Sequence, residues 1–135
     1  MEVKNKKAYY DYEILKEYEA GIELVGTEIK SVRKGSVDLK DSFVTIKDNE
    51  AFALNIYIAK YEEGNIFNHD ERRTRRLLLH KQEIKKLKEA KEKEGISIIP
   101  LKMYFKNNKA KLLIGIAKGK TLYDKRETTK KRDLE

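Results

Sequence analysis

Apolar and polar side chains alternate along much of this chain, which predicts a protein built mainly of short β-strands. Along residues 10–18 the even positions carry Tyr10, Tyr12 and Ile14, while most odd positions carry acidic residues. A period of two is typical of a strand with one buried face. Beyond Gly21, which interrupts the first strand, the same pattern predicts strands at residues 22–24, 37–40, 42–47, 52–58, 99–105 and 112–116.

Two turns are predicted between these strands. The pairs Asp48–Asn49 and Asn107–Asn108 both tolerate positive φ, so each is expected to form a tight hairpin turn. The odd positions from 99 to 105 are all apolar and are expected to share one face of their strand. Pro100 restricts that strand to an edge or a bulge.

Two segments follow a helical period instead. Thr27 to Gly35 predicts a short helix, with Thr27 as N-cap, Glu28 in the favourable first turn, and Lys30 and Arg33 on a basic face. Residues 80–94 predict a longer helix with a narrow apolar stripe around Leu87. Residues 1–8 are polar and are expected to be frayed.

These elements favour a mainly β fold with flanking helices. A partly closed antiparallel barrel of the OB type closes a small sheet and presents a face that binds nucleic acid. We expect residues 1–120 to form this barrel. Residues 118–135 carry seven Lys or Arg against four Asp or Glu and almost no apolar side chains. A basic tail at 121–135, disordered in the free protein, is the expected continuation.

The net charge of the chain indicates what kind of molecule it binds. The chain has 31 Lys and Arg against 23 Asp and Glu, a net charge of +8. Such an excess indicates a polyanionic partner. No apolar run reaches the length of a membrane span and no secretory signal is visible, so we expect a cytoplasmic protein without a membrane partner.

Enzymatic chemistry has little support in the sequence. The absence of cysteine excludes disulfides, thiolate metal sites and thiol nucleophiles. The only imidazoles are His69 and His80, without a metal-ligand spacing, and a hydrogen bond within a loop is the expected role of His69. We therefore expect no catalytic residue, no metal and no cofactor.

Clustered cations and an interleaved aromatic favour RNA contact. Arginine binds phosphate with two hydrogen bonds, and unstacked bases lie on aromatic rings. Leu78 lies in a three-leucine run and is either a core residue or an exposed contact. The residues that this chemistry selects, all expected to be exposed, are Lys30, Arg33, Arg73, Arg75, Arg76, Tyr104 and Lys106.

An ordered set of motifs resembles a known family. The segments concerned are Asn5–Ala8, Tyr18–Ile22, Gly26–Arg33, Asp41–Val44, Glu50–Phe52, His69–Lys81, Pro100–Asn107, Ala117–Lys120 and Asp124–Arg126. In this order they are similar to the family of small protein B, which binds transfer-messenger RNA (SsrA). Glu71 stands where the family usually has Pro, and Phe105 where Trp is common. Family members carry a longer basic tail, so we expect the chain to be truncated at Glu135.

The resemblance implies an OB-like barrel that binds the tRNA-like domain of transfer-messenger RNA. The complex would enter a stalled ribosome with elongation factor Tu and aminoacylated RNA, the protein acting as a monomer and contacting ribosomal RNA. A role after binding is implied for Asp124, Lys125 and Arg126. RNA binding is implied for Asn5, Glu19, Leu78 and His80. Four lysines within the matching segments are further candidates for RNA contact: Lys6, Lys7, Lys118 and Lys120.

Three questions stay open at this point. Glu19 could accept hydrogen bonds from RNA, could orient a neighbouring cation, or could form a structural salt bridge. A generic OB-fold binder of single-stranded or structured RNA is the first alternative function. A metal-dependent RNA nuclease is the second, although no acidic or imidazole cluster supports it.

Overall fold

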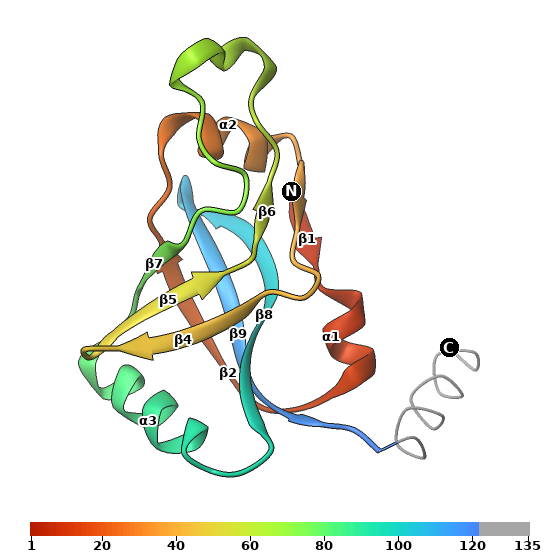
Figure 1. Ribbon diagram of the computed structural model, residues 1–135, viewed down its shortest axis with the longest axis vertical. Coiled ribbons are helices and arrows are strands. Elements are labelled where there is room, and N and C mark those ends of the chain that lie inside the picture. The colour runs from red at the N-terminus through yellow and green to blue at the C-terminus, as the bar shows by residue number, and fades with distance from the viewer. Residues whose placement is uncertain (122–135) are drawn as a thin grey trace.

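The computed structural model describes residues 1–121, apart from the side chains of residues 64–66 (Figure 1). Its helices are α1 (Lys6–Asp11), α2 (Gly26–Arg33), α3 (Lys81–Lys91) and the 3-10 helix η1 (Glu62–Phe67). Its strands are β1 (Glu2–Lys4), β2 (Tyr12–Ile22), β3 (Val37–Asp38), β4 (Phe43–Lys47), β5 (Glu50–Leu54), β6 (Tyr57–Ile58), β7 (Arg75–Leu78), β8 (Ile96–Lys106) and β9 (Lys109–Gly119).

Seven of the described strands form one antiparallel sheet, in the order β1-β8-β9-β2-β7-β5-β4. The sheet coils so that β4 approaches β8, as the crossing ribbons of Figure 1 illustrate. Within residues 1–121 no hydrogen-bonded pairing joins its two edge strands, so the sheet is open. The structure therefore confirms a mainly antiparallel β-sheet with three α-helices, and not a closed barrel.

The main core lies inside the coiled sheet. Leu112, Ile114 and Ile116 of β9 alternate into it as the sequence predicts. Leu87 brings α3 onto the same core and is fully buried, which confirms the apolar stripe of the longer helix. Both predicted hairpin turns are also confirmed, because Asp48, Asn49 and the Asn107–Asn108 pair all have positive φ.

The N-terminal segment contradicts the prediction of a frayed end. Residues 2–4 pair with β8, and residues 6–11 form α1, so Tyr10 lies in a helix and not in a strand. Asn5 explains the difference. Its buried side chain accepts a hydrogen bond from the backbone N–H of Ala8 and donates to the carbonyl oxygens of Leu39 and Pro100. Leu39 and Pro100 lie far from Asn5 in the sequence, so the local pattern of apolar residues cannot reveal these contacts.

The prediction of one strand over 52–58 is also wrong. β5 ends at Leu54, and Asn55, with a φ of 63°, turns the chain so that β6 pairs with β3 in a separate two-stranded sheet. In β5 the buried side chains are the small ones of Ala51 and Ala53. The alternation of apolar residues in the sequence therefore continues past Asn55, although the strand itself ends at Leu54.

Pro100 produces the bulge that the sequence allows. The pairing of β8 with β9 shifts between Pro100 and Lys102, and the shift reverses the faces of the strand. Ile99 and Leu101 pack in a second small cluster beside α1, while Met103 faces the main core. The prediction that positions 99–105 share one face is therefore wrong.

Two other boundaries differ from prediction. Val25, not Thr27, is the N-cap of α2, because Thr27 lies inside the helix and its hydroxyl contacts His69. β9 continues to Gly119, and the backbone N–H of Lys120 bonds to the carbonyl oxygen of Asp11. β9 therefore extends two residues into the basic stretch that begins at 118. Among the described residues no helix has the length and apolarity that crossing a membrane requires.

Candidate nucleic-acid interface

The arginine cluster at the start of β7 divides between the inside and the outside of the protein. Arg75 is fully buried, and its Nε lies 2.5 Å from Oε2 of Glu28, which is also fully buried. Arg73 Nη2 lies 2.6 Å from the other oxygen of the same carboxylate. The prediction that Arg75 is an exposed RNA contact is therefore wrong. β7 alternates inward and outward, and position 75 points inward.

This buried ion pair holds α2 against β7. Arg75 also donates to the carbonyl oxygens of Ile56 and Glu71, so its guanidinium fixes the loop before β7. Burial raises the pKa of Glu28, but hydrogen bonds from Arg73, the Val25 backbone and Arg75 outweigh it, so the pKa lies below its ordinary value. Glu28 is therefore ionised at neutral pH.

Beyond this cluster, one outward side chain of β7, that of Leu78, borders a groove of about 760 Å³. Leu78 projects into it and is 48% exposed, which contradicts the core alternative and agrees with an exposed contact. Opposite Leu78 in the pairing stands Gly21, where a Cβ atom would lie 3.2 Å from the Leu78 Cβ. Glycine thus keeps this part of the groove open.

The groove brings together residues from four parts of the chain. Glu19 comes from β2, Leu78 from β7, and His80 stands exposed just before α3. Ile29 and Glu83 contribute from α2 and α3. Phe105, Lys109 and Lys111, which also line the groove, are absent from the candidates chosen from sequence. Lys109 and Lys111 belong to the cluster of cations around the Asn107–Asn108 turn that favours RNA contact in the sequence, although neither is among the selected residues.

A hydrogen-bonded set marks one side of this groove. The hydroxyl of Tyr104 donates to Oε2 of Glu19 over 2.6 Å, and Lys106 Nζ lies 3.6 Å from Oε1. These contacts, chiefly the Tyr104 hydrogen bond, hold the pKa of Glu19 below its ordinary value. Burial and the same carboxylate raise the pKa of Tyr104 to about 12. At neutral pH the Glu19 carboxylate is therefore a charged hydrogen-bond acceptor, held by the neutral Tyr104 hydroxyl and by Lys106.

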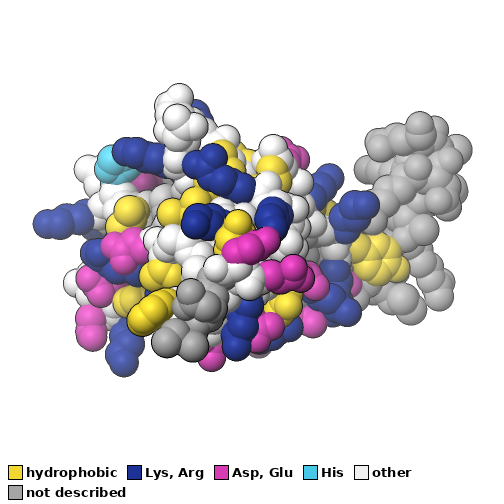
Figure 2. All heavy atoms as spheres, turned by 90° about the horizontal axis from the view of Figure 1, so that it is seen from above, with side chains coloured by type: hydrophobic (Ala, Val, Ile, Leu, Met, Phe, Trp, Pro, Cys, Tyr) yellow, Lys and Arg dark blue, Asp and Glu magenta, His cyan; other side chains and the backbone are white. Residues whose placement is uncertain are grey.

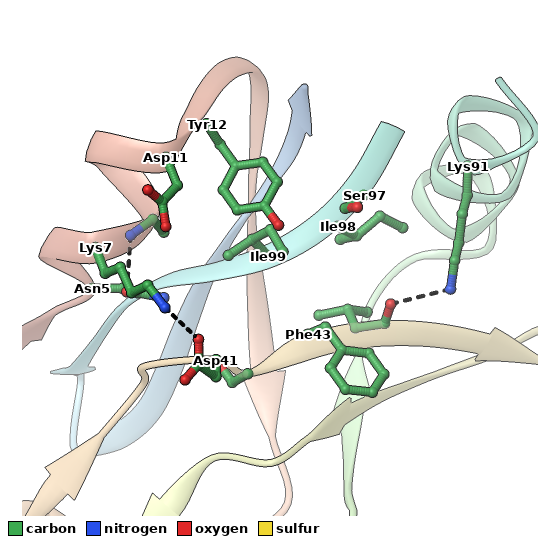
Figure 3. A pocket seen from close by; sticks show the side chains of 13 residues that line it. Asn5, Lys7, Asp11, Tyr12, Asp41, Phe43, Lys91, Ser97, Ile98 and Ile99 are labelled. Carbon is green, nitrogen blue, oxygen red and sulfur yellow. Dashed lines mark hydrogen bonds and ion pairs between the residues drawn. The ribbon is translucent and has the colours of Figure 1, made fainter. Parts of the chain in front are cut away.

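Other predicted residues gather around α1, away from the groove. Asn5 and Lys7 line a second pocket of about 410 Å³ between α1, β4 and β8, in which Lys7 pairs with Asp41 at 2.9 Å (Figure 3). Asn5 is buried in its structural hydrogen bonds, which contradicts a free contact role in this structure. Lys6 and Lys118 are exposed, and Lys120 Nζ donates to the carbonyl oxygen of Tyr9.

The basic face of α2 is exposed, as the sequence predicts. The Arg33 guanidinium stacks over the ring of Phe105, 5.1 Å from its centroid, and so borders the groove. Lys30 lies over Tyr61 instead. Arg76 is 45% exposed and pairs with Glu23 and Glu50 at 3.2 Å each. Figure 2 shows Lys and Arg side chains spread over this end of the molecule, with acidic and apolar side chains between them.

The loop histidine has the structural role expected of it. His69 is buried, with Nδ1 2.8 Å from the Thr27 hydroxyl and Nε2 2.9 Å from the carbonyl oxygen of Ile58. Within residues 1–121 no group of three His, Cys, Asp or Glu could hold a metal ion. The tail residues Asp124, Lys125 and Arg126 lie outside the described residues.

Comparison with known proteins identifies the chain. The family model of the SmpB protein matches residues 2–135. The chain belongs to the SmpB family. Among its relatives, the SsrA-binding protein of Ligilactobacillus salivarius is 60% identical over 97% of this chain and 84% of the relative. That of Carboxydothermus hydrogenoformans is 54% identical over 96% of this chain and 87% of the relative.

A solved structure agrees with this assignment. It is described as "tmRNA-SmpB: a journey to the center of the bacterial ribosome". Its matching chain is 46% identical, with a TM-score of 0.76 over 95% of this chain and 94% of that one. The resemblance inferred from ordered motifs is thereby confirmed at the level of the SmpB family.

Proposed function

We propose that this chain is an RNA-binding protein of trans-translation, not an enzyme. It binds the tRNA-like domain of transfer-messenger RNA and delivers it to stalled ribosomes. One observation carries the proposal: in a member of the SmpB family, Glu19, Leu78 and His80 meet in one groove bordered by lysines. A folded RNA offers phosphates to these lysines and unpaired bases to the apolar floor.

The proposal includes the finer architecture. The coiled sheet acts as a partly closed OB-like barrel, since β4 approaches β8 although no pairing links them. Such a barrel binds nucleic acid on its strands and the adjoining loops. The remaining candidates contribute phosphate contacts around it or on the ribosome. Arg73 and Lys120 are half-buried, and the exposed ones are Lys6, Lys7, Lys30, Arg33, Arg76 and Lys118.

A binding assay tests the proposal. The chain is titrated against the tRNA-like domain, with folded tRNA and with an unstructured RNA of equal length as competitors. We expect the tRNA-like domain to bind tightest and the unstructured RNA to compete poorly. Equal binding of all three RNAs would instead favour the generic OB-fold binder. Cleavage of any of them in divalent metal would favour the nuclease.

The tail carries a separate role in this proposal. The cations of residues 122–135, which lie outside the described residues, gain phosphate partners on ribosomal RNA in the cytoplasm. They do so after elongation factor Tu and the aminoacylated RNA have delivered a single copy of the protein. Replacing Asp124, Lys125 and Arg126 together by Ala should leave affinity for the tRNA-like domain unchanged and abolish peptide tagging on stalled ribosomes. Lost RNA affinity in this variant would contradict the division of roles.

A further inference from the structure

A carboxylate stands where a phosphate-binding surface should avoid one. Glu19 shares its groove with Lys109 and Lys111, and Lys106 lies beside it. An RNA phosphate near this carboxylate would meet electrostatic repulsion. A neutral polar residue at this position would avoid the repulsion. The Glu19 carboxylate is therefore expected to bind a group other than phosphate.

Two residues of one strand, β8, hold both carboxylate oxygens of Glu19. Tyr104 and Lys106 are two residues apart on β8, and each contacts a different oxygen of the carboxylate. β9 lies between β8 and β2, so the Tyr104 side chain reaches across a whole strand to its partner. Two contacts from one side fix the orientation of the carboxylate plane.

The held carboxylate still has room for a ligand. An ionised carboxylate offers about four acceptor positions, and the side chains of residues 1–121 take two of them. The Glu19 side chain is 34% exposed and lines the groove. Its lowered pKa keeps it an acceptor at neutral pH. Such a group binds N–H or O–H donors, which phosphates lack.

We propose that Tyr104 and Lys106 position Glu19 as a fixed acceptor that selects unpaired nucleotides by their donor groups. The donors are base N–H groups or ribose 2′-hydroxyls. Tyr104 is then a positioning residue that acts through Glu19, rather than the direct RNA contact inferred from its place in the sequence. This inference rests on the proposed RNA-binding function.

Three variants of the full chain test the inference: Tyr104→Phe, Glu19→Gln and the two combined. Tyr104→Phe removes only the donor hydroxyl, and Tyr57→Phe on β6 is the matched control. Affinity for the tRNA-like domain should fall about tenfold in Glu19→Gln and somewhat less in Tyr104→Phe, as expected for one lost hydrogen bond to a charged group. The double variant should bind no more weakly than Glu19→Gln.

Three readouts separate positioning from a structural role. In both single variants the melting temperature and the dependence of affinity on salt should match those of the unmodified chain, because no phosphate contact is lost. Additive losses in the double variant would make Tyr104 an independent contact. Tighter binding by Glu19→Gln would make the carboxylate merely repulsive. Either result overturns the inference.

Modified RNAs identify the donor. One version of the tRNA-like domain carries 2′-deoxyribose at its unpaired loop positions, and another carries inosine there in place of guanosine, which removes the 2-amino group. One of the two should weaken binding to the unmodified chain and leave binding to Glu19→Gln unaffected. If each RNA modification changes the affinity of the unmodified chain and that of Glu19→Gln by the same factor, the inference fails. If the unmodified chain does not prefer the tRNA-like domain at all, the proposed function itself fails.

Discussion

Glu28 and Glu19 are the same residue type held by similar partners in opposite settings. Glu28 is fully buried and pairs with Arg75 and Arg73, whereas the Glu19 side chain is 34% exposed and is held by Tyr104 and Lys106. Burial leaves the Glu28 carboxylate no access to a ligand. The Glu19 carboxylate has acceptor positions that face a groove. The difference in burial separates a carboxylate that supports the scaffold from one that is available to a ligand.

The largest effect expected from this comparison concerns stability. Glu28→Gln leaves two guanidinium groups without their counter-charge, and breaking a buried pair in this way costs about 3–5 kcal/mol. Urea unfolding followed by circular dichroism measures it. The same substitution at Glu19 serves as control and should leave the midpoint unchanged. Equal shifts in both variants would show that burial does not distinguish the two carboxylates.

The second prediction concerns the cations that surround Glu19. If about five phosphates are neutralised, the logarithm of RNA affinity should fall with the logarithm of salt concentration at a slope of about −3 to −5. Between 50 and 200 mM salt this amounts to roughly a hundredfold or more. Binding isotherms over that range provide the slope. A slope near zero would mean that the groove acts through its apolar and acceptor groups alone.

Leu78 provides the third test. Its side chain is half exposed in the groove, so Leu78→Ala should weaken binding of the tRNA-like domain about tenfold while stability changes by about 0.5 kcal/mol or less. Leu77→Ala is the matched control on the opposite face of β7, because Leu77 is buried and its truncation should cost about 2–5 kcal/mol. Thermal melts beside the binding assay measure both. Unaltered affinity in Leu78→Ala would remove this residue from the interface.

Local pattern was sufficient for some elements and insufficient for others. The β8–β9 hairpin and α3 were predictable because their apolar periods and turn residues lie within one short segment. Arg75 was not, because its partner Glu28 lies 47 residues away in the sequence. A run of four arginines in five positions looks uniformly exposed until the strand direction of β7 decides which of them points inward.

The same limit applies to the candidate site. Leu78 and His80 could be chosen from sequence through the family resemblance, and the structure brings both into one groove with Glu19. The link between Glu19 and Tyr104 spans 85 residues and depends on the order of strands in the sheet, which no local pattern specifies. Asn5 was selected for RNA binding by resemblance, yet its hydrogen bonds to distant carbonyl groups give it a structural role here.

The last prediction concerns the dependence of stability on pH, and it again compares the two carboxylates. The folded-state pKa of Glu28 lies below its ordinary value of 4.5, so the unfolded chain takes up the proton first. The stabilisation that this group contributes is complete above about pH 4.5 and is lost as the pH falls through the folded-state pKa. Urea midpoints of the unmodified chain and of Glu28→Gln should therefore converge as the pH falls below about 4.5. Glu19→Gln should differ little from the unmodified chain at any pH, since solvent screens the Glu19 carboxylate and keeps the contribution of its lowered pKa to stability small. A constant gap between the unmodified chain and Glu28→Gln would show that the buried pair stabilises the fold by packing rather than by charge.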